Sequence, residues 1–189
     1  ERTYAQREVN RLAAKQAIGR RASEEIRDGH VVCFDAGTTT MEVAQAAPDS
    51  GYVAVTNMAE LALELAGDEV PVKLTGGTVR PRSHALVGPT AASFLDRTNF
   101  DLLFLGTNGV ATDTGLSTPN EAEAEVKRRM ITAASRVVLV TDGSKFGERS
   151  FVSVAGPGEI DLVVTDTDLP PDLAAAFEDA DVAVTGVDR

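Results

Sequence analysis

With 189 residues and 43% hydrophobic amino acids, the chain is long enough for one sizeable core and short for two full domains. Its net charge of −11, with acidic residues dispersed along the chain, makes it a poor partner for nucleic acid, which requires a basic surface. No apolar run approaches the roughly 20 residues needed to span a bilayer, and the N-terminus does not resemble a signal peptide. We therefore expect a cytoplasmic protein without a membrane partner.

The acidity is combined with a scarcity of lysine. Lysine stands only at positions 15, 73, 127 and 145, whereas Asp and Glu together number 29. This balance fits a protein adapted to high salt, so we expect a halophilic source; an acidic protein from a GC-rich genome is the alternative. The single cysteine, Cys33, cannot form an internal disulfide and is expected to be a small buried hydrophobic residue.

Residues 4–28 are predicted to form one leading helix, because apolar residues recur at helical spacing until Asp28-Gly29. The basic residues that distinguish this stretch are Arg7, Arg11, Lys15, Arg20 and Arg21. Basic helices can bind DNA, but we interpret these charges as a solvated helix face. Since the chain starts abruptly at Glu1, the segment 1–28 looks cut from something longer.

Strands and helices alternate along the rest of the chain. Strands are predicted at 31–34, 52–55, 70–74, 102–105, 137–140, 151–154, 162–165 and 182–185. Helices are predicted at 38–47, 58–66, 89–95, 120–134 and 170–180, with a loop rich in Gly, Thr and Pro before 120. Apolar strands that alternate with helices indicate one α/β domain over 1–189, with a mainly parallel sheet flanked by helices.

Five of the strands end in turns of glycine and small polar residues. The turns are Asp35-Ala36-Gly37-Thr38-Thr39-Thr40, Thr56-Asn57, Thr75-Gly76-Gly77, Gly106-Thr107-Asn108-Gly109 and Thr141-Asp142-Gly143-Ser144-Lys145. Ligands of open α/β sheets bind beyond the carboxyl ends of the strands, and a helix start attracts anions. The turns therefore predict a pocket for a small, polyhydroxylated anion such as a sugar phosphate. For the first turn, the alternative is an ordinary loop in which Thr38 merely caps a helix.

Single charges in or near these turns have two interpretations each. Lys145 could meet a phosphate or carboxylate, or be a surface lysine, and the same choice applies to Arg80. Asp35 and Asp142 could orient ligand hydroxyls or cap their turns. Glu121 stands in the first turn of its helix and can face the pocket.

Other polar side chains are given a plain interpretation. Lys127 is expected to be a solvated helix residue, and His30 and His84 are expected at the surface. No His, Cys or carboxylate spacing typical of a metal site is found. Neither a G-x-G-x-x-G nor a G-x-x-x-x-G-K-[ST] motif is present, so we expect no cofactor.

In this order, the turns resemble the C-terminal effector-binding domain of the DeoR/GlpR family of transcriptional regulators. The matching motifs are Asp35-x-Gly37-Thr38-Thr39-Thr40, Val55-Thr56-Asn57, Leu74-Thr75-Gly76-Gly77-x-Val79-Arg80, Val87-Gly88-Pro89, Asp101 with Phe104-x-Gly106-x-Asn108-Gly109, Glu121-(x)5-Lys127, Thr141-Asp142-x-Ser144-Lys145-Phe146-Gly147, Asp161 and Thr165-Asp166. The resemblance covers nearly the whole chain, from the first helix to the last strand.

The resemblance implies a Rossmann-like fold similar to that of ribose-5-phosphate isomerase. It also implies a domain that senses phosphorylated sugars or sugar alcohols and that assembles as a dimer or tetramer. Operator DNA would be bound only through an N-terminal winged helix-turn-helix, which is absent here. Residues 1–28 would lead out of the missing linker, and the whole protein would repress sugar or glycerol metabolism genes. The ligand site expected from the turns and the resemblance comprises Asp35, Gly37, Thr38, Thr39, Thr40, Thr56, Asn57, Gly76, Gly77, Arg80, Asn108, Gly109, Glu121, Asp142 and Lys145.

The rival interpretation is an enzyme, a sugar-phosphate isomerase or an aminosugar-phosphate deaminase on the same scaffold. Such chemistry needs a carboxylate as general base, and the isomerases that the domain resembles carry acids on the turn after the fourth strand. Here that turn is Gly106-Thr107-Asn108-Gly109, in which no residue can act as a base near neutral pH. Glu121, Asp35 and Asp142 remain as substitutes, so we expect a receptor and no catalytic residue. A purely structural oligomerisation module is a third possibility, but it would not need so many hydroxyls at strand ends.

Overall fold

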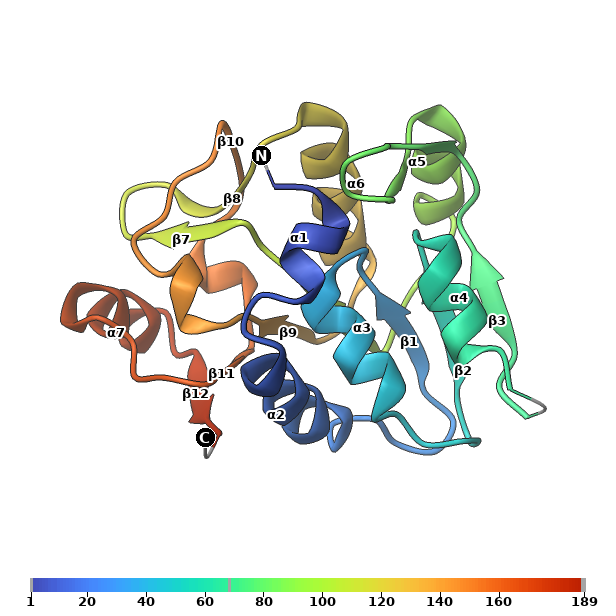
Figure 1. The fold of residues 1–189 in the computed structure, drawn as a ribbon, viewed down its shortest axis with the longest axis horizontal. Coiled ribbons are helices and arrows are strands. Elements are labelled where there is room, and N and C mark those ends of the chain that lie inside the picture. The colour runs from blue at the N-terminus through green and yellow to red at the C-terminus, as the bar shows by residue number, and fades with distance from the viewer. Residues whose placement is uncertain (1, 68, 188–189) are drawn as a thin grey trace.

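The computed structural model describes residues 2–67 and 69–187, and the strands in these ranges build a seven-stranded parallel sheet of order β12-β11-β9-β6-β1-β2-β3 (Figure 1). Its strands are β1 (Val31–Phe34), β2 (Val53–Thr56), β3 (Val72–Leu74), β6 (Leu102–Leu105), β9 (Val137–Val140), β11 (Leu162–Thr165) and β12 (Ala183–Gly186). The chain first runs outward from β1 to β3 and then returns to the other side of β1. The strand order therefore reverses between β1 and β6, which is where open α/β sheets form a ligand crevice.

Helices cover both faces of this sheet. They are α1 (Tyr4–Glu8), α2 (Leu12–Ser23), α3 (Thr38–Gln45), α4 (Ala59–Leu65), α5 (Pro89–Leu95), α6 (Glu121–Ala133) and α7 (Pro171–Asp179), with short 3₁₀ turns at Gly143–Lys145 and Pro157–Glu159. In Figure 1, α2, α3 and α4 lie on the viewer's side of the sheet. Because successive strand residues point to opposite faces, Val32 and Phe34 pack under α1–α4, whereas Cys33 packs with α5, α6 and α7. The expected buried, unpaired Cys33 is confirmed.

Short antiparallel strands occupy four segments in which the sequence predicts loops, and a fifth agrees with the strand predicted at 151–154. The strands β7 (Gly109–Ala111), β8 (Gly115–Thr118) and β10 (Val152–Ala155) form one small sheet, and β4 (Thr78–Val79) and β5 (Leu86–Val87) form another. Runs of two to four residues are too short to reveal a strand period. Gly77 enters β4 with a φ of 118°, and a Cβ there would lie 2.6 Å from Val87 O, so glycine is required at this position.

The expected single leading helix is wrong, because the structure has two helices, α1 and α2. The break falls at Arg11, whose φ of 57° and ψ of 38° are left-handed. A non-glycine residue in this region costs of order 1–3 kcal/mol, so tertiary contacts must hold Arg11 there. Elsewhere the expected elements agree with the structure to within two residues at each end.

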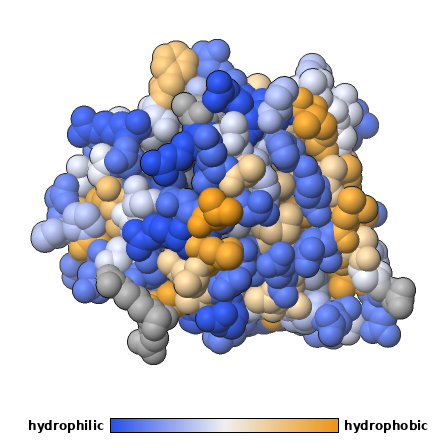
Figure 2. Space-filling model, viewed as in Figure 1, coloured by the Kyte–Doolittle hydropathy of each residue, from blue (hydrophilic) through white to orange (hydrophobic). Residues whose placement is uncertain are grey.

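α2 packs tightly on α3. A Cβ added at Gly19 of α2 would lie 2.4 Å from the backbone oxygen of Glu42 in α3, so only glycine permits this approach. The contact fixes the start of α3 beside the N-terminal helices. Within the two described ranges, no helix is long and apolar enough to cross a membrane. Figure 2 shows that the face viewed in Figure 1 is mostly hydrophilic, with small hydrophobic areas between polar side chains.

Candidate functional site

A cleft opens at the carboxyl ends of β1, β6 and β9, on both sides of the reversal in strand order. Its empty volume is about 540 Å³, including the part that is open to solvent. The residues that line it are Arg7, Asn10, Lys15, Ala36, Gly37, Thr38, Thr39, Thr40, Gly106, Thr107, Asn108, Glu123, Lys127, Asp142 and Lys145. They come from three strand-end turns, from α6 and, unexpectedly, from the N-terminal helices.

The start of α3 forms the floor of the cleft. Gly37 is the N-cap residue, its backbone is extended at φ −179°, and no side chain of the described chain caps the helix there. The alternative in which Thr38 merely caps α3 is therefore wrong. Thr40 Oγ1 donates to the carbonyl oxygens of Asp35 at 2.6 Å and Gly37 at 2.9 Å, so this hydroxyl holds the turn together. The start of α3 at Thr38 and Thr39 thus lines the cleft, and the amides of a helix start are a favourable place for an anion.

A buried ion pair connects the turns after β1 and β6. Lys127 Nζ contacts Asp35 Oδ2 and donates to Gly106 O at 3.0 Å, while Gly106 N donates to Asp35 Oδ2 at 3.0 Å. Burial raises the pKa of Asp35, and the neighbouring Lys127 ammonium opposes this rise. The expectation of a solvated Lys127 is wrong, since only 5% of the residue is exposed. The pair therefore makes a rigid back wall.

The cleft gathers cations from separate elements. Lys15 of α2 is almost fully buried, and its Nζ donates to the backbone oxygen of Arg7 in α1. Burial lowers the pKa of Lys15 to about 8; the carboxylate of Asp142 opposes this shift, and the charges of Lys145 and Arg7 add to it. Burial also lowers the pKa of Lys145, where Arg7 again contributes. These ammonium and guanidinium groups therefore repel one another across the cleft.

The guanidinium group of Arg7 contains buried N–H groups that are not hydrogen-bonded within the described chain. Its Nε and Nη2 atoms are buried, yet they find no hydrogen-bond partner among the residues that the structure describes. These two N–H groups form the side of a guanidinium that binds two oxygens of one anion. Unpaired buried donors are costly, so an oxyanion in the cleft would satisfy both.

The interpretation of the basic N-terminal stretch as a solvated face is thus wrong for the residues nearest the cleft. Arg7 and Lys15 line the cleft, and Arg11 pairs with Asp142 and Asp166 at the ends of β9 and β11. The available signal was the clustering of basic residues at intervals of four in an otherwise acidic chain, although the break at Arg11 means that they do not share one helix face. Of the chain's four lysines, Lys15, Lys127 and Lys145 line this one cleft.

About half of the expected site residues line the cleft. They are Gly37, Thr38, Thr39, Thr40, Asn108, Asp142 and Lys145, with Asp35 directly behind them. The expected residues outside the lining are Thr56, Asn57, Gly76, Gly77, Arg80, Gly109 and Glu121. The turns after β2 and β3 lie one and two strands beyond β1, at roughly 4.8 Å per strand, which moves them away from the reversal point. Ligand contact by any of these residues stays a prediction.

Several residues outside the lining support it. Asn57 Oδ1 accepts from Ala36 N at 2.8 Å and so anchors the loop that leads to α3. Arg80 Nη1 lies 2.7 Å from Glu123 Oε1, and Ser83 contacts the same oxygen. Glu123, rather than the exposed Glu121, therefore faces the cleft from α6. The sequence analysis did not single out Glu123, although it stands one half-turn beyond Glu121.

The two histidines lie away from the cleft lining. His84 is partly exposed and stacks on Tyr4, with ring centroids 5.0 Å apart. Over residues 2–67 and 69–187, no group of three or more His, Cys, Asp or Glu side chains is arranged to hold a metal ion. The cleft is lined by ammonium, guanidinium, hydroxyl and amide groups, together with the carboxylates of Glu123 and Asp142.

A family model described as the DeoR C-terminal sensor domain matches residues 10–167. The HTH-type transcriptional regulator GlpR of Haloferax volcanii is 56% identical over 191 aligned residues, which cover 100% of this chain and 75% of that protein. The glycerol-3-phosphate regulon repressor of Escherichia coli K12 is 30% identical over 175 residues, covering 92% of this chain and 69% of the repressor.

A solved structure shares the architecture. D-ribose-5-phosphate isomerase in complex with phospho-erythronic acid matches with a TM-score of 0.53 at 16% identity, over 73% of this chain and 55% of the isomerase. Identity this low shows the fold alone, and the expected α/β fold similar to the isomerase is confirmed. The family model and the regulators carry the assignment further: this chain belongs to the DeoR C-terminal sensor domain family, as the sensor domain of a GlpR-like transcriptional regulator.

Proposed function

We propose that this domain binds a phosphorylated sugar or sugar alcohol in the cleft and that occupancy changes the operator affinity of a repressor of sugar or glycerol metabolism genes. One observation carries the proposal. Buried and partly buried cations that repel one another, among them Arg7 with two unpaired N–H groups, surround an uncapped helix start. A dianionic phosphate would neutralise the charges and accept from the amides, the hydroxyls and the guanidinium together.

The rest of the cleft suits the polyhydroxylated part of such a ligand. Asn108 supplies an amide, and Thr107, Asp142 and Glu123 supply oxygens at the same opening. A carboxylate can accept hydrogen bonds from two sugar hydroxyls at once, and an amide side chain can accept from one hydroxyl and donate to another. The name of the E. coli relative refers to the glycerol-3-phosphate regulon, which supports a three-carbon or sugar phosphate as the first ligand to test here.

The same proposal includes the position of this domain within a longer, oligomeric regulator. The expected winged helix-turn-helix would precede residue 1 in the longer regulator and would make the contact with operator DNA. The protein would act in the cytoplasm as a dimer or tetramer, and effector binding would alter how its subunits are arranged. The relatives extend beyond the matched region, which leaves room for such a domain.

The enzyme alternative is less well supported by the carboxylates near the cleft. Asp35 pairs with Lys127, Glu123 with Arg80, and Asp142 with Arg11. Each of these carboxylates is thus engaged in an ion pair, whereas a general base must be free to accept a proton from the substrate. The printed names of the relatives are those of transcriptional regulators.

A ligand screen by thermal shift, in buffer with molar potassium chloride, tests the proposal. It compares glycerol 3-phosphate, fructose 1-phosphate, fructose 6-phosphate, glucose 6-phosphate and ribose 5-phosphate with their unphosphorylated parents. A phosphorylated compound that raises the melting temperature and stays intact by NMR is the expected result. Conversion of a bound compound would instead identify an isomerase or deaminase. If no compound changes the melting temperature, the proposal is contradicted.

A further inference from the structure

The segment Tyr4–Arg11, which we call the strap, crosses the cleft and is attached on both sides. At its first end, Tyr4 N donates to Arg82 O at 2.8 Å, and the Tyr4 ring stacks on His84 with an interplanar angle of 17°. His84 Nδ1 in turn lies 2.7 Å from Glu60 Oε1 of α4. The strap therefore begins on the loop between β4 and β5.

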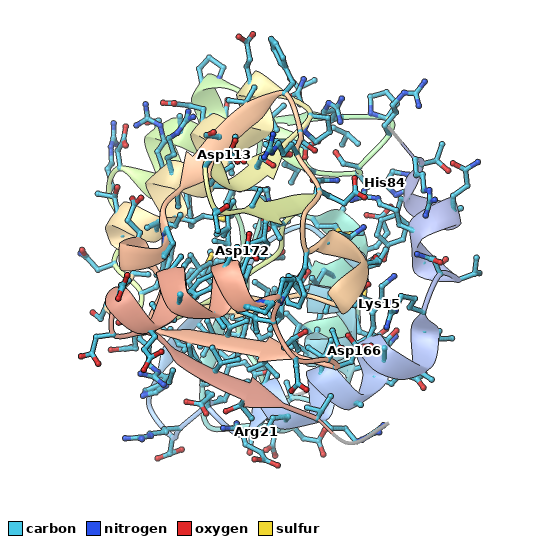
Figure 3. All side chains as sticks on the ribbon, turned by 90° about the vertical axis from the view of Figure 1, so that its left-hand side faces the viewer. Lys15, Arg21, His84, Asp113, Asp166 and Asp172 are labelled. Atoms are coloured by element: carbon cyan, nitrogen blue, oxygen red, sulfur yellow. The ribbon has the colours of Figure 1, made fainter. Side chains whose placement is uncertain are left out.

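At its other end, the strap is attached to the far side of the cleft. Arg11 Nη2 contacts Asp166 Oδ2, and Arg11 Nε lies 3.5 Å from Asp142 Oδ1. Both carboxylates are almost fully buried and follow β11 and β9. These ion pairs explain why Arg11 keeps its left-handed backbone. Figure 3 shows His84, Lys15 and Asp166 in succession beside the blue N-terminal helices, which trace the path of the strap.

Between the two attachments, the strap faces the cleft. Arg7 and Asn10 line the cleft, and Lys15 of α2 donates a hydrogen bond to the backbone oxygen of Arg7. The Arg7 Nε and Nη2 atoms are buried without a partner in the described chain, as is the Tyr4 hydroxyl at the first attachment. Arg7, which lines the cleft, thus has two unused N–H donors on the strap.

We propose that Arg7 binds the anionic group of the effector through Nε and Nη2, so that the strap is a wall of the binding site and reports occupancy directly. This inference rests on the proposed function and names a contact that the strand-end turns do not supply. A bound phosphate would join the strap to the start of α3 and remove the repulsion among Arg7, Lys15 and Lys145. The strap would then be held more firmly, and this change would pass to whatever precedes Tyr4 in the longer regulator.

Calorimetry with glycerol 3-phosphate tests the contact. Arg7→Met is expected to raise the Kd by about ten- to a hundredfold, the range for loss of charge-assisted hydrogen bonds. Arg7→Lys, which keeps the charge and loses the fork, is expected to recover only part of the affinity. Arg20→Met is the matched control, because it removes the same charge from an exposed position of α2 and should change the Kd by less than about twofold.

Hydrogen exchange of the strap amides supplies a second readout, which does not depend on calorimetry. Glycerol 3-phosphate is expected to slow exchange of the Tyr4 and Arg7 amides in the wild type and not in Arg7→Met. Without ligand, Arg11→Met is expected to accelerate exchange of these amides roughly tenfold, because both ion pairs are lost, while the β1 amides stay unchanged.

The outcomes separate the two proposals. If Arg7→Met and the wild type bind glycerol 3-phosphate equally, the strap inference is overturned and the proposed function stands. Unchanged exchange in Arg11→Met would overturn the attachment. If the wild type binds neither glycerol 3-phosphate, the sugar phosphates of the screen nor inorganic phosphate, the proposed function fails and the Arg7 contact fails with it.

Discussion

At the scale of single residues, the cleft depends on charges that are buried in pairs and on charges that are buried without one. Asp35 and Lys127 belong to the first kind, and the buried Lys15 and the partly buried Arg7 and Lys145 belong largely to the second. A buried pair contributes little net stability, but removal of one partner leaves an uncompensated charge. We therefore expect the first kind to act in folding, and we propose that the second acts in ligand binding.

Lys127→Met is expected to destabilise the domain by about 3–5 kcal/mol, because Asp35 would stay buried without its cation. Urea unfolding at constant salt measures this loss. The double variant Asp35→Asn with Lys127→Met should recover a large part of it, since no charge then remains buried. Lys73→Met, at an exposed position of β3, is the control for loss of a lysine. Equal stability of the two single lysine variants would contradict the structural role of the pair.

Ligand affinity is expected to fall as the pH rises through about 8, the pKa of Lys15 in the unliganded protein. A bound anion would raise this pKa, so binding takes up a proton above pH 8 and none well below it. The fall should approach about tenfold per pH unit between the free and bound pKa values. The Kd for glycerol 3-phosphate, measured from about pH 7 to about pH 9.5, avoids the second phosphate ionisation near 6.

Lys15→Met provides the control for this pH dependence. The variant should bind more weakly and show a shallower profile, to which Lys145 still contributes because burial also lowers its pKa. Asp142 and Glu42 are the carboxylates that act on Lys15. An identical profile in the variant would exclude Lys15 as the titrating group.

At the scale of elements, the cleft is a meeting point of helix starts and strand ends that only close packing brings together. Gly19 allows α2 to touch α3, and Gly37 begins α3 without a capping side chain. The 3₁₀ turn after β9 presents Lys145 to the same space. The elements thus supply the site with oriented amides, whereas their side chains supply charge and hydroxyls.

Thr39→Val is expected to weaken binding of a phosphorylated ligand about three- to tenfold, because it removes one hydroxyl from the first turn of α3. Lys145→Ala should weaken binding by about tenfold or more, through loss of an ammonium. Thr39→Ser, which keeps the hydroxyl, is the control. Calorimetry gives the affinities, and melting temperatures show whether each variant is folded. Unchanged affinity in both Thr39→Val and Lys145→Ala would remove the basis for this ligand position.

At the scale of the whole molecule, a strongly acidic surface surrounds a cationic cleft. The net charge is −11, yet three of the four lysines line the cleft. Dispersed negative charges repel one another in the compact state, and this repulsion falls as salt screens it. The negative electrostatic potential of the remaining surface opposes the approach of an anion. A cleft that binds an anion therefore needs several cations close together.

The melting temperature is expected to rise by several degrees or more as potassium chloride increases from low to molar concentration, because screening relieves the self-repulsion of the folded chain. Thermal unfolding followed by circular dichroism measures the change. A variant in which several exposed Asp and Glu residues become Asn and Gln should respond less. If the melting temperature of the wild type does not change with the potassium chloride concentration, adaptation to high salt is contradicted.

The sequence was sufficient for most of the sheet and for the parts of the site that are local. The strands 31–34, 102–105, 137–140 and 162–165 are apolar runs bounded by turns, and their ends agree with the structure. The Thr38-Thr39 helix start was predictable because a helix N-terminus is a property of a few neighbouring residues. The hairpin of β7 and β8 was missed, because its strands are short and β8 also pairs with β10, more than thirty residues away.

What the sequence by itself determined is the alternation of strands and helices and the polar turns at the strand ends, from which we infer the proposed kind of ligand. Only the tertiary structure decided which turns meet. The reversal of strand order brings the turns after β1, β6 and β9 together and leaves those after β2 and β3 outside. It also buries Lys127 against Asp35, 92 positions away, and lays the strap across the cleft. Such contacts follow from packing in space, which spacing along a chain does not specify.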